Sequence, residues 1–260
     1  MNKTSGVAQR ERIAAFFDEA SASRDSLFAN EPVLGYEQEV RQRALMELVD
    51  PQPPDRILDV GCGNARDGTL IADHVALWAG VDVSLGMLQR GRTSLVDIGA
   101  PPLLAMSDAA RLPFADGTFN KVYCSEVIEH VPEWERILPE IRRILCPRGL
   151  LVITTPNRIS MYRPIRILTD TIRRIGGVAR KHPYDEWKTL RGVHRALSAA
   201  GFGPIRAIGV CFVPGQWTYL VPRRVQSVIV AATRFLEPLL RTKVIWGGYM
   251  IATSASRMES

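Results

Sequence analysis

Short apolar runs alternate with amphipathic stretches through the middle of the chain. The apolar runs are bounded by glycine, proline or polar residues, and they predict buried strands at 56–60, 77–83, 103–106, 121–124 and 150–154. The stretches between them have helical periodicity at 67–74, 85–95 and 134–146. Strands that alternate with helices build right-handed βαβ crossovers, so the pattern predicts an α/β fold with a doubly wound, mostly parallel sheet.

The two ends of the chain have different patterns. Two amphipathic helices are predicted ahead of the sheet, at 8–20 and 36–49. After Gly201 the pattern predicts a strand, a basic and apolar helix and a last strand, at 205–212, 223–241 and 244–253. We interpret this end as an antiparallel hairpin that carries a helical insertion, which completes a seven-stranded sheet.

The composition is that of a globular protein. The chain has 260 residues, of which 46% are apolar and 23% are charged, enough for one large domain with a buried core. Its four cysteines form no CxxC pair, which argues against a zinc ribbon and against a secreted disulfide scaffold. The first residues lack the apolar core of a signal peptide, so we expect a cytoplasmic protein. The longest apolar stretch, 225–233, is too short to span a membrane.

A glycine-rich loop follows the first predicted strand. It reads Asp59-Val60-Gly61-Cys62-Gly63 and precedes a predicted helix, the setting in which glycines let the backbone approach a nucleotide ligand. A dinucleotide loop would have a third glycine where Arg66 stands, which places NAD second. The carboxylate of Asp59 suits a cationic amino-acid ligand, and S-adenosylmethionine has that chemistry.

With these residues the chain resembles the class I S-adenosylmethionine-dependent methyltransferases. The resemblance rests on five ordered motifs between residues 55 and 156 and implies a Rossmann-like fold. It implies that Asp82, in Gly-Val-Asp-Val-Ser, binds the ribose hydroxyls, and that Asp108 binds the adenine amine. Where the family usually has Asp, this chain has Asn120, which receives no role. The cofactor-binding residues expected are Asp59, Gly61, Cys62, Gly63, Asp82, Val83, Asp108, Ala109 and Ser125.

Two carboxylates and a histidine follow the fourth predicted strand. If this segment is helical, Glu126, Glu129 and His130 lie on one face and can hold a divalent ion such as Mg²⁺ or Mn²⁺, with His182 as a fourth ligand. This Glu-x-x-Glu-His motif is followed by Thr-Pro-Asn at 155–157 and by His-x-x-x-Glu-Trp at 182–187. The order of the three motifs resembles metal-dependent 2′-O-methyltransferases of small-RNA ends and ubiquinone-pathway O-methyltransferases. Both resemblances imply methylation of a hydroxyl group, whose pKa a bound cation lowers.

The same residues also fit a mechanism without a metal. Glu129 and His130 occur in methyltransferases that use no metal, where they shape the pocket or a loop. In that case His130 or His182 is the candidate catalytic general base. Both alternatives stay open at this point.

The net charge is +6, and the basic residues gather in an insertion at 158–183. This segment fits a lid that attracts phosphate, anionic lipid or RNA, or else a solvated helix face, and it lacks the aromatic platform of single-stranded RNA binders. A second insertion, 217–241, has aromatic residues beginning with Trp217 and Tyr219. It fits a roof over a lipophilic acceptor or a membrane-surface helix, with core packing or dimerisation as the alternative.

These observations lead to one expected function. We expect methyl transfer to a small-molecule hydroxyl, on a lipophilic or glycosidic compound, by a domain at 55–260 that a helical cap at 1–54 precedes. In that cap, Phe16, Phe17 and Tyr36 are expected to cover the cofactor or the acceptor. The alternatives are a metal-dependent RNA 2′-O-methyltransferase and a non-catalytic protein that binds S-adenosylmethionine.

Overall fold

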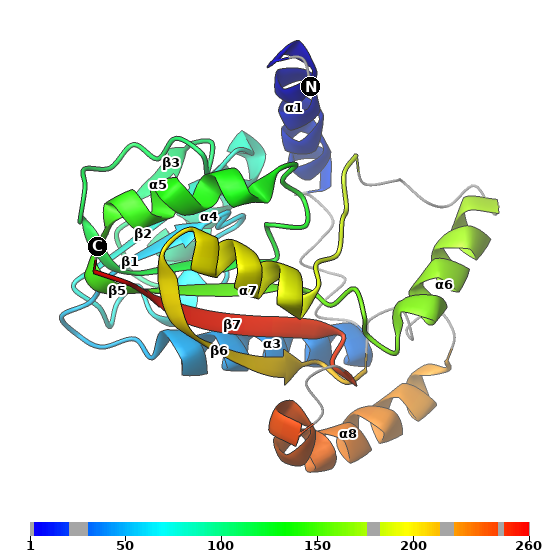
Figure 1. Ribbon diagram of the computed structural model, residues 1–260. Coiled ribbons are helices and arrows are strands. Elements are labelled where there is room, and N and C mark those ends of the chain that lie inside the picture. The colour runs from blue at the N-terminus through cyan, green and yellow to red at the C-terminus, as the bar shows by residue number, and fades with distance from the viewer. Residues whose placement is uncertain (1–2, 21–30, 176–182, 214–220, 244–246, 260) are drawn as a thin grey trace.

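The structure, a computed structural model, describes residues 3–20, 31–175, 183–213, 221–243 and 247–259 (Figure 1). Its strands are β1 (Arg56–Val60), β2 (Leu77–Asp82), β3 (Leu104–Met106), β4 (Phe119–Ser125), β5 (Leu145–Pro156), β6 (Phe202–Val210) and β7 (Met250–Arg257). Its helices are α1 (Lys3–Ala20), α3 (Pro32–Val49), α4 (Leu85–Asp97), α5 (Ile137–Ile144), α6 (Arg163–Ile175), α7 (Leu190–Ala199) and α8 (Arg223–Lys243). Two 3-10 turns are η1 (Gly68–Leu70) and η2 (Trp134–Arg136).

Within the part of the chain that the structure describes, the strands form one sheet. The order is β3-β2-β1-β4-β5-β7-β6, with β1 to β5 parallel and β7 antiparallel to both of its neighbours. The predicted fold class is therefore confirmed, including the closing antiparallel hairpin. The strand order reverses between β1 and β4, and in open α/β sheets ligands bind at such a point, beyond the carboxyl ends of the strands.

Alternating residues of β1 pack into cores on opposite faces of the sheet. Ile57 belongs to a core built with α3 and α4, whereas Leu58 belongs to a core built with α5 and α7. This alternation follows from the period of two in a strand, and both faces are apolar because helices cover both. The residues of α3 pack in the same core as β1, so this core crosses the predicted boundary between residues 54 and 55. The division of the chain at that boundary stays a prediction.

Several predicted elements differ in extent from the structure, among them β5, which begins at Leu145 although residues 134–146 were predicted to be helical. The helix predicted at 67–74 is a short 3-10 turn, η1, in which Gly68 packs closely on the Trp78 ring and Asp67 bonds to Arg41 of α3. The last strand was predicted at 244–253. In the structure it begins at Met250 and ends at Arg257. Its polar end becomes a strand because β5 and β6 bond to it on both sides.

The two cores predict where substitutions destabilise the fold. Ile141 of α5 is fully buried, whereas Ile172 of α6 is 55% exposed. We expect Ile141→Ala to lower the free energy of unfolding by about 2 to 5 kcal/mol, because it leaves a cavity. The same substitution at Ile172 should change it by less than about 0.5 kcal/mol. Urea unfolding measures both, and equal losses would contradict the assignment of the buried face.

Candidate active site

The glycine loop turns sharply after β1. The backbone N–H groups of Gly61 and Cys62 both donate to the Val81 carbonyl, at 2.7 and 3.0 Å. Gly61 has φ +78, and a Cβ there would lie 2.3 Å from Val127, so both its conformation and its neighbour require glycine. At Gly63, by contrast, a Cβ would meet nothing within 4 Å. The loop therefore has open space beside Gly63, where a ligand can approach the backbone.

The carboxylate of Asp82 connects this loop to the next helix. Its Oδ2 accepts from the Gly63 N–H at 2.8 Å, and its Oδ1 accepts from the Ser84 N–H at 2.8 Å. Burial raises the pKa of Asp82, while these backbone hydrogen bonds lower it. Ser84 caps α4, since its hydroxyl accepts from the Met87 N–H at 3.1 Å. Asp82 thus lies between the glycine loop and the start of α4.

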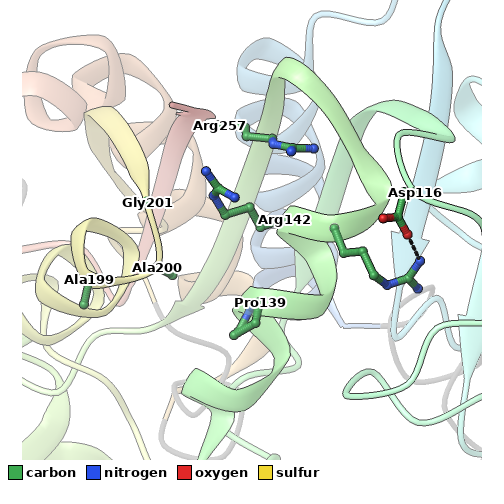
Figure 2. A pocket seen from close by; sticks show the side chains of 8 residues that line it. Asp116, Pro139, Arg142, Ala199, Ala200, Gly201 and Arg257 are labelled. Atoms are coloured by element: carbon green, nitrogen blue, oxygen red, sulfur yellow. Dashed lines mark hydrogen bonds and ion pairs between the residues drawn. The ribbon is translucent and has the colours of Figure 1, made fainter. Parts of the chain in front are cut away.

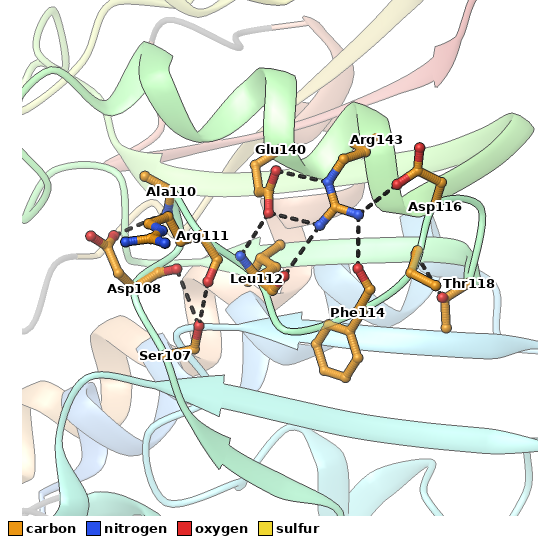
Figure 3. A network of polar contacts seen from close by, with 11 residues as sticks. Ser107, Asp108, Ala110, Arg111, Leu112, Phe114, Asp116, Thr118, Glu140 and Arg143 are labelled. Atoms are coloured by element: carbon orange, nitrogen blue, oxygen red, sulfur yellow. Dashed lines mark hydrogen bonds and ion pairs between the residues drawn. The ribbon is translucent and has the colours of Figure 1, made fainter.

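An ion cluster on α5 holds the segment that follows β3, which contains Asp108 and Ala109. Figure 3 shows Arg143 donating to the carbonyls of Leu112 and Phe114, at 3.2 and 2.8 Å, while it pairs with Glu140. Glu140 also accepts from the Leu112 N–H at 2.8 Å, and Arg143 holds the pKa of Glu140 below its usual value. These contacts of Arg143 and Glu140 with the segment after β3 were not predicted from the sequence. The signal for them is an opposite-charge pair three residues apart on a predicted helix.

Asp59 is buried at the carboxyl end of β1. The hydroxyl of Tyr123 bonds to its carboxyl group, and the Trp78 indole N–H donates to that hydroxyl at 3.0 Å. Burial, followed by the neighbouring carboxylate of Asp67, raises the pKa of Asp59 well above its usual value. Asp59 is therefore held by side chains of β2 and β4, its two neighbours in the sheet.

Arg41 of α3 reaches into the same edge of the sheet. Its guanidinium donates to both oxygens of Asp67, at 2.9 and 3.1 Å, and also to the Ser125 hydroxyl. Its positive charge acts on Glu126 and Asp59 as well. Arg41 was not predicted from the sequence, because its partners lie far along the chain and no motif contains it. The side chain of Ser125, which was expected to bind the cofactor, is thus held by Arg41 of α3.

The Glu-x-x-Glu-His segment forms a turn and not a helix. Glu126 has φ +57, and its carboxylate accepts from the Thr154 hydroxyl at 3.1 Å. Glu129 accepts from the Thr155 hydroxyl at 3.0 Å. Burial raises the pKa of Glu126 to about 7, although Arg41 lowers it. Burial and the Glu126 charge raise the pKa of Glu129 well above its usual value. Both carboxyl groups therefore bond to β5.

His130 is the last residue of this Glu-x-x-Glu-His segment, and its ring contacts α1. Its Nδ1 is 3.2 Å from the Tyr184 carbonyl, and its Nε2 is 3.9 Å from a Glu129 carboxyl oxygen. A carbonyl only accepts hydrogen bonds, so in the neutral ring Nδ1 carries the proton and Nε2 has the lone pair. The Phe17 ring packs edge-on against the imidazole, with ring centroids 5.5 Å apart.

These positions do not form the predicted metal site. Among the described residues, no three side chains of His, Cys, Asp or Glu come together as a group that could hold a metal ion. The carboxyl groups of Glu126 and Glu129 bond to separate threonines of β5, because the segment is not helical. His182, the fourth ligand expected, lies outside the described residues. The donor set therefore does not support the expected Mg²⁺ or Mn²⁺.

Helix α1 lies against the cofactor segments as well as against His130. Asp18 accepts from the Ser84 hydroxyl at 2.5 Å and from the Gly86 N–H at 2.8 Å, both at the start of α4. Phe16 packs edge-on against Phe17, which contacts His130. Tyr36, the third aromatic residue expected to cover the site, is instead buried in the core beneath α3.

A cavity of about 620 Å³ lies at the opposite edge of the sheet (Figure 2). Its lining includes Arg142 and Arg257, whose guanidinium groups donate to the carbonyls of Met258 and Leu145. Gly201, at the start of β6, also lines it. Leu145 and Gly201 lie at the amino ends of β5 and β6, and Arg257 ends the antiparallel β7. The cavity is therefore separate from the glycine loop, and its arginines bond to the backbone at these strand ends.

Residues 58–153 match the methyltransferase domain family. A demethylmenaquinone methyltransferase of Parafrankia sp. (strain EAN1pec) is 30% identical over 250 residues, which cover 88% of this chain and 94% of that protein. The demethylmenaquinone methyltransferase of Mycolicibacterium gilvum is 29% identical, over 79% of this chain and 92% of that protein.

Solved structures show the same fold. An S-adenosylmethionine-dependent methyltransferase of Thermotoga maritima, described as a possible histamine N-methyltransferase, has a TM-score of 0.69 at 16% identity, over 94% of this chain and 99% of that one. The geranyl diphosphate C-methyltransferase of Streptomyces coelicolor A3(2) has a TM-score of 0.62 at 15% identity, over 96% of this chain and 98% of that one.

The strand order and the glycine loop define the class, a Rossmann-like α/β protein with its ligand loop after β1. Within that class, the chain belongs to the class I S-adenosylmethionine-dependent methyltransferase family. The family and the enzyme class expected from the motifs are therefore confirmed, and so is S-adenosylmethionine as the family's cofactor.

The raised pKa of Glu126 predicts how stability depends on pH. The folded pKa is about 7 and the usual value is 4.5, so folding favours the protonated acid. This stability is fully present below pH 4.5 and is lost as the pH rises through 7. Glu126→Gln has no such loss, and we expect it to be more stable than the wild type at pH 8 by about 1 to 3 kcal/mol.

Urea unfolding at pH 5 and pH 8 measures this effect. The two proteins should differ much less at pH 5 than at pH 8. Glu135→Gln is the control, because Glu135 is exposed and lies outside the site. A Glu126→Gln difference that is the same at both pH values would contradict the burial argument.

Proposed function

We propose that this methyltransferase methylates a hydroxyl group of a small, lipophilic acceptor that lies beside His130 and beneath α1. The observation that carries the proposal is the fixed imidazole: Tyr184 holds Nδ1 as the donor and Phe17 packs on the ring. A neutral imidazole with its lone pair at Nε2 is suited to take a proton from a hydroxyl. The contact with Phe17 supports an acceptor with apolar surface.

The geometry also supports the cofactor residues that the motifs suggest. Beside Gly63 there is open space where a Cβ would lie, which fits a ligand that approaches the backbone. Asp82 uses part of its accepting capacity on backbone N–H groups, and a carboxylate has about four lone-pair sites, so it can also accept from the ribose. We assign adenine recognition to Asp108. The remaining contacts are assigned to Asp59, Gly61, Cys62, Val83, Ala109 and Ser125.

The reaction follows from these positions. S-adenosylmethionine supplies an electrophilic methyl group on a sulfonium sulfur when it is bound. His130 takes the hydroxyl proton at Nε2, and the acceptor oxygen forms a bond to the methyl carbon as the carbon–sulfur bond breaks. The products are a methyl ether and S-adenosylhomocysteine, with the proton on His130. The glycine loop and α1 act by positioning the two reactants, which supplies a large part of the acceleration.

A carbon acceptor is the second candidate. The relatives named demethylmenaquinone methyltransferase favour it, since one is 30% identical over 94% of its own length. Removing the proton from a ring hydroxyl also makes the neighbouring ring carbon nucleophilic. His130 would then perform the same proton transfer, and the new bond would form at carbon. The two candidates share a hydroxyl-bearing ring and differ in the position of the methyl group in the product.

The cofactor assignment is tested with S-adenosylhomocysteine. We expect Asp82→Asn to weaken its affinity by about 10- to 100-fold, because a charged hydrogen bond to each ribose hydroxyl becomes a neutral one. Isothermal titration calorimetry measures the change. Asp97→Asn is the matched control, since Asp97 is exposed at the far end of α4, and its affinity should equal that of the wild type. Equal affinities of all three proteins would contradict the assignment.

The acceptor assignment is tested with methyl-labelled S-adenosylmethionine and a panel of long-chain phenols, quinols and alcohols. Mass spectrometry and NMR of the product distinguish a methyl ether from a ring methyl group. We expect His130→Gln to lower kcat by about 10²- to 10⁴-fold and to leave S-adenosylhomocysteine affinity unchanged. His74→Gln is the control, because the His74 side chain is 73% exposed.

Three outcomes would contradict parts of this proposal. Turnover of RNA oligonucleotides and of no compound in the panel would overturn the small-molecule acceptor. Turnover that EDTA abolishes and Mg²⁺ or Mn²⁺ restores would assign the activation of the hydroxyl to a metal ion. A kcat for His130→Gln that matches the His74→Gln control would remove His130 as the base.

A further inference from the structure

Helix α8 attaches to the domain by its charged side. Arg234 and Arg241 pair with Glu39 and Glu47 of α3, the second pair at 2.6 Å. On the same side of the helix, Glu237 is only 3% exposed. The inward side of α8 therefore carries these ion pairs and Glu237, together with Val230, which is buried in the core.

The opposite side of α8 is apolar and faces solvent. At 3.6 residues per turn, the residues of this stripe fall on one face of the helix. Phe235 is 85% exposed and Val228 is 69% exposed. The whole stripe consists of Val225, Val228, Phe235, Leu236 and Leu239.

Helix α6 has the same inverted arrangement. Arg166 packs inward, where it pairs with Asp185 at 3.1 Å and lies over the Trp187 ring at 5.3 Å. The apolar residues are on the other side and are between 55% and 81% exposed, namely Ile167, Leu168, Ile172 and Ile175. Figure 1 shows that α6 and α8 both stand out from the layered body of the domain. Amphipathic helices of a globular domain usually bury this apolar side.

Charge indicates what covers these apolar faces. The only acidic residue of α8, Glu237, is buried on the inward side, while Arg223 and Arg224 are exposed at its start. On α6, the only acidic residue is Asp170, which pairs with Arg166 at 2.6 Å. On α8, the outward apolar residues are therefore accompanied by exposed arginines at the start of the helix and by no exposed acidic residue. This combination complements anionic lipid headgroups, and like charges disfavour a second copy of the chain.

We propose that the outward faces of α6 and α8 dock on the surface of an anionic lipid membrane. Helices of this kind lie in the interface plane, with the apolar side among the acyl chains and the basic residues at the headgroups. Within the described residues, no helix has the length and apolar character that crossing a membrane requires. The proposal concerns a surface outside the reaction site and holds whichever acceptor is methylated.

Docking at α6 would also place the candidate active site at the lipid surface. Asp185 pairs with Arg166 of α6, and the neighbouring Tyr184 holds His130 through its carbonyl. The segment that orients the imidazole is therefore anchored on a docking helix.

Vesicle co-sedimentation tests the proposal. We expect the full chain to bind phosphatidylcholine vesicles that contain about 30% phosphatidylglycerol at least about tenfold better than pure phosphatidylcholine vesicles, and to release them as NaCl rises. Val228→Asp on α8 and Ile172→Asp on α6 should each weaken binding about tenfold or more. Arg223→Gln with Arg224→Gln should weaken it about fivefold per arginine.

Val96→Asp is the matched control. Val96 is 55% exposed on α4, so the substitution adds the same charge to an exposed apolar helix position away from the proposed surface. Its vesicle binding should equal that of the wild type, and thermal unfolding of all variants shows that each is folded. Absence of binding to the anionic vesicles would overturn the proposal, as would equal binding by all variants. A dimer in light scattering that only Val228→Asp dissociates, without vesicle binding, would assign the face to a second copy.

Discussion

The site depends on one buried guanidinium. Arg41 donates to both oxygens of Asp67 and to Ser125, and its charge lowers the pKa values of Asp59 and Glu126, which burial raises. Three carboxyl groups converge where the strand order reverses, and without a cation between them each would disfavour ionisation of the others. Because the cation comes from α3, that helix is joined electrostatically to the ends of β1 and β4. A substitution in α3 that displaces Arg41 would therefore change the electrostatic environment of Asp59, two residues before the glycine loop.

The parts of the site that could be predicted from the sequence have local causes. The glycine loop is visible because Gly61 must adopt a positive φ beside Val127, and Asp82 is visible because it ends a strand with a clear apolar run. Arg41 was missed because its partner comes from another element: 26 residues separate Arg41 from Asp67. Arg143 pairs with Glu140 of its own helix, but the backbone carbonyls that it holds lie in a different segment, which no motif indicates. The polar end of β7 was missed for a similar reason, since pairing on both sides makes it a strand.

The Glu-x-x-Glu-His segment shows why spacing alone does not define chemistry. The metal hypothesis required helical spacing, and the left-handed residue Glu126 prevents a helix at the end of β4. Each carboxyl group then bonds to a different threonine of β5, and the two do not come together with a third ligand among the described residues. His130 alone is oriented by a backbone carbonyl. The turn thus favours proton transfer by an imidazole over metal chemistry.

The two inverted helices follow the same logic at the surface. Periodicity in the sequence identifies an apolar stripe but not the side that faces the core, so membrane contact and core packing or dimerisation both stayed open for residues 217–241. In the structure, ion pairs with Glu39 and Glu47 bind the polar side of α8 to α3. Its apolar side is then left in water, where the hydrophobic effect favours any partner that covers it. Because Asp185 connects α6 to the segment that holds His130, such a partner would bear on the reaction site as well as on stability.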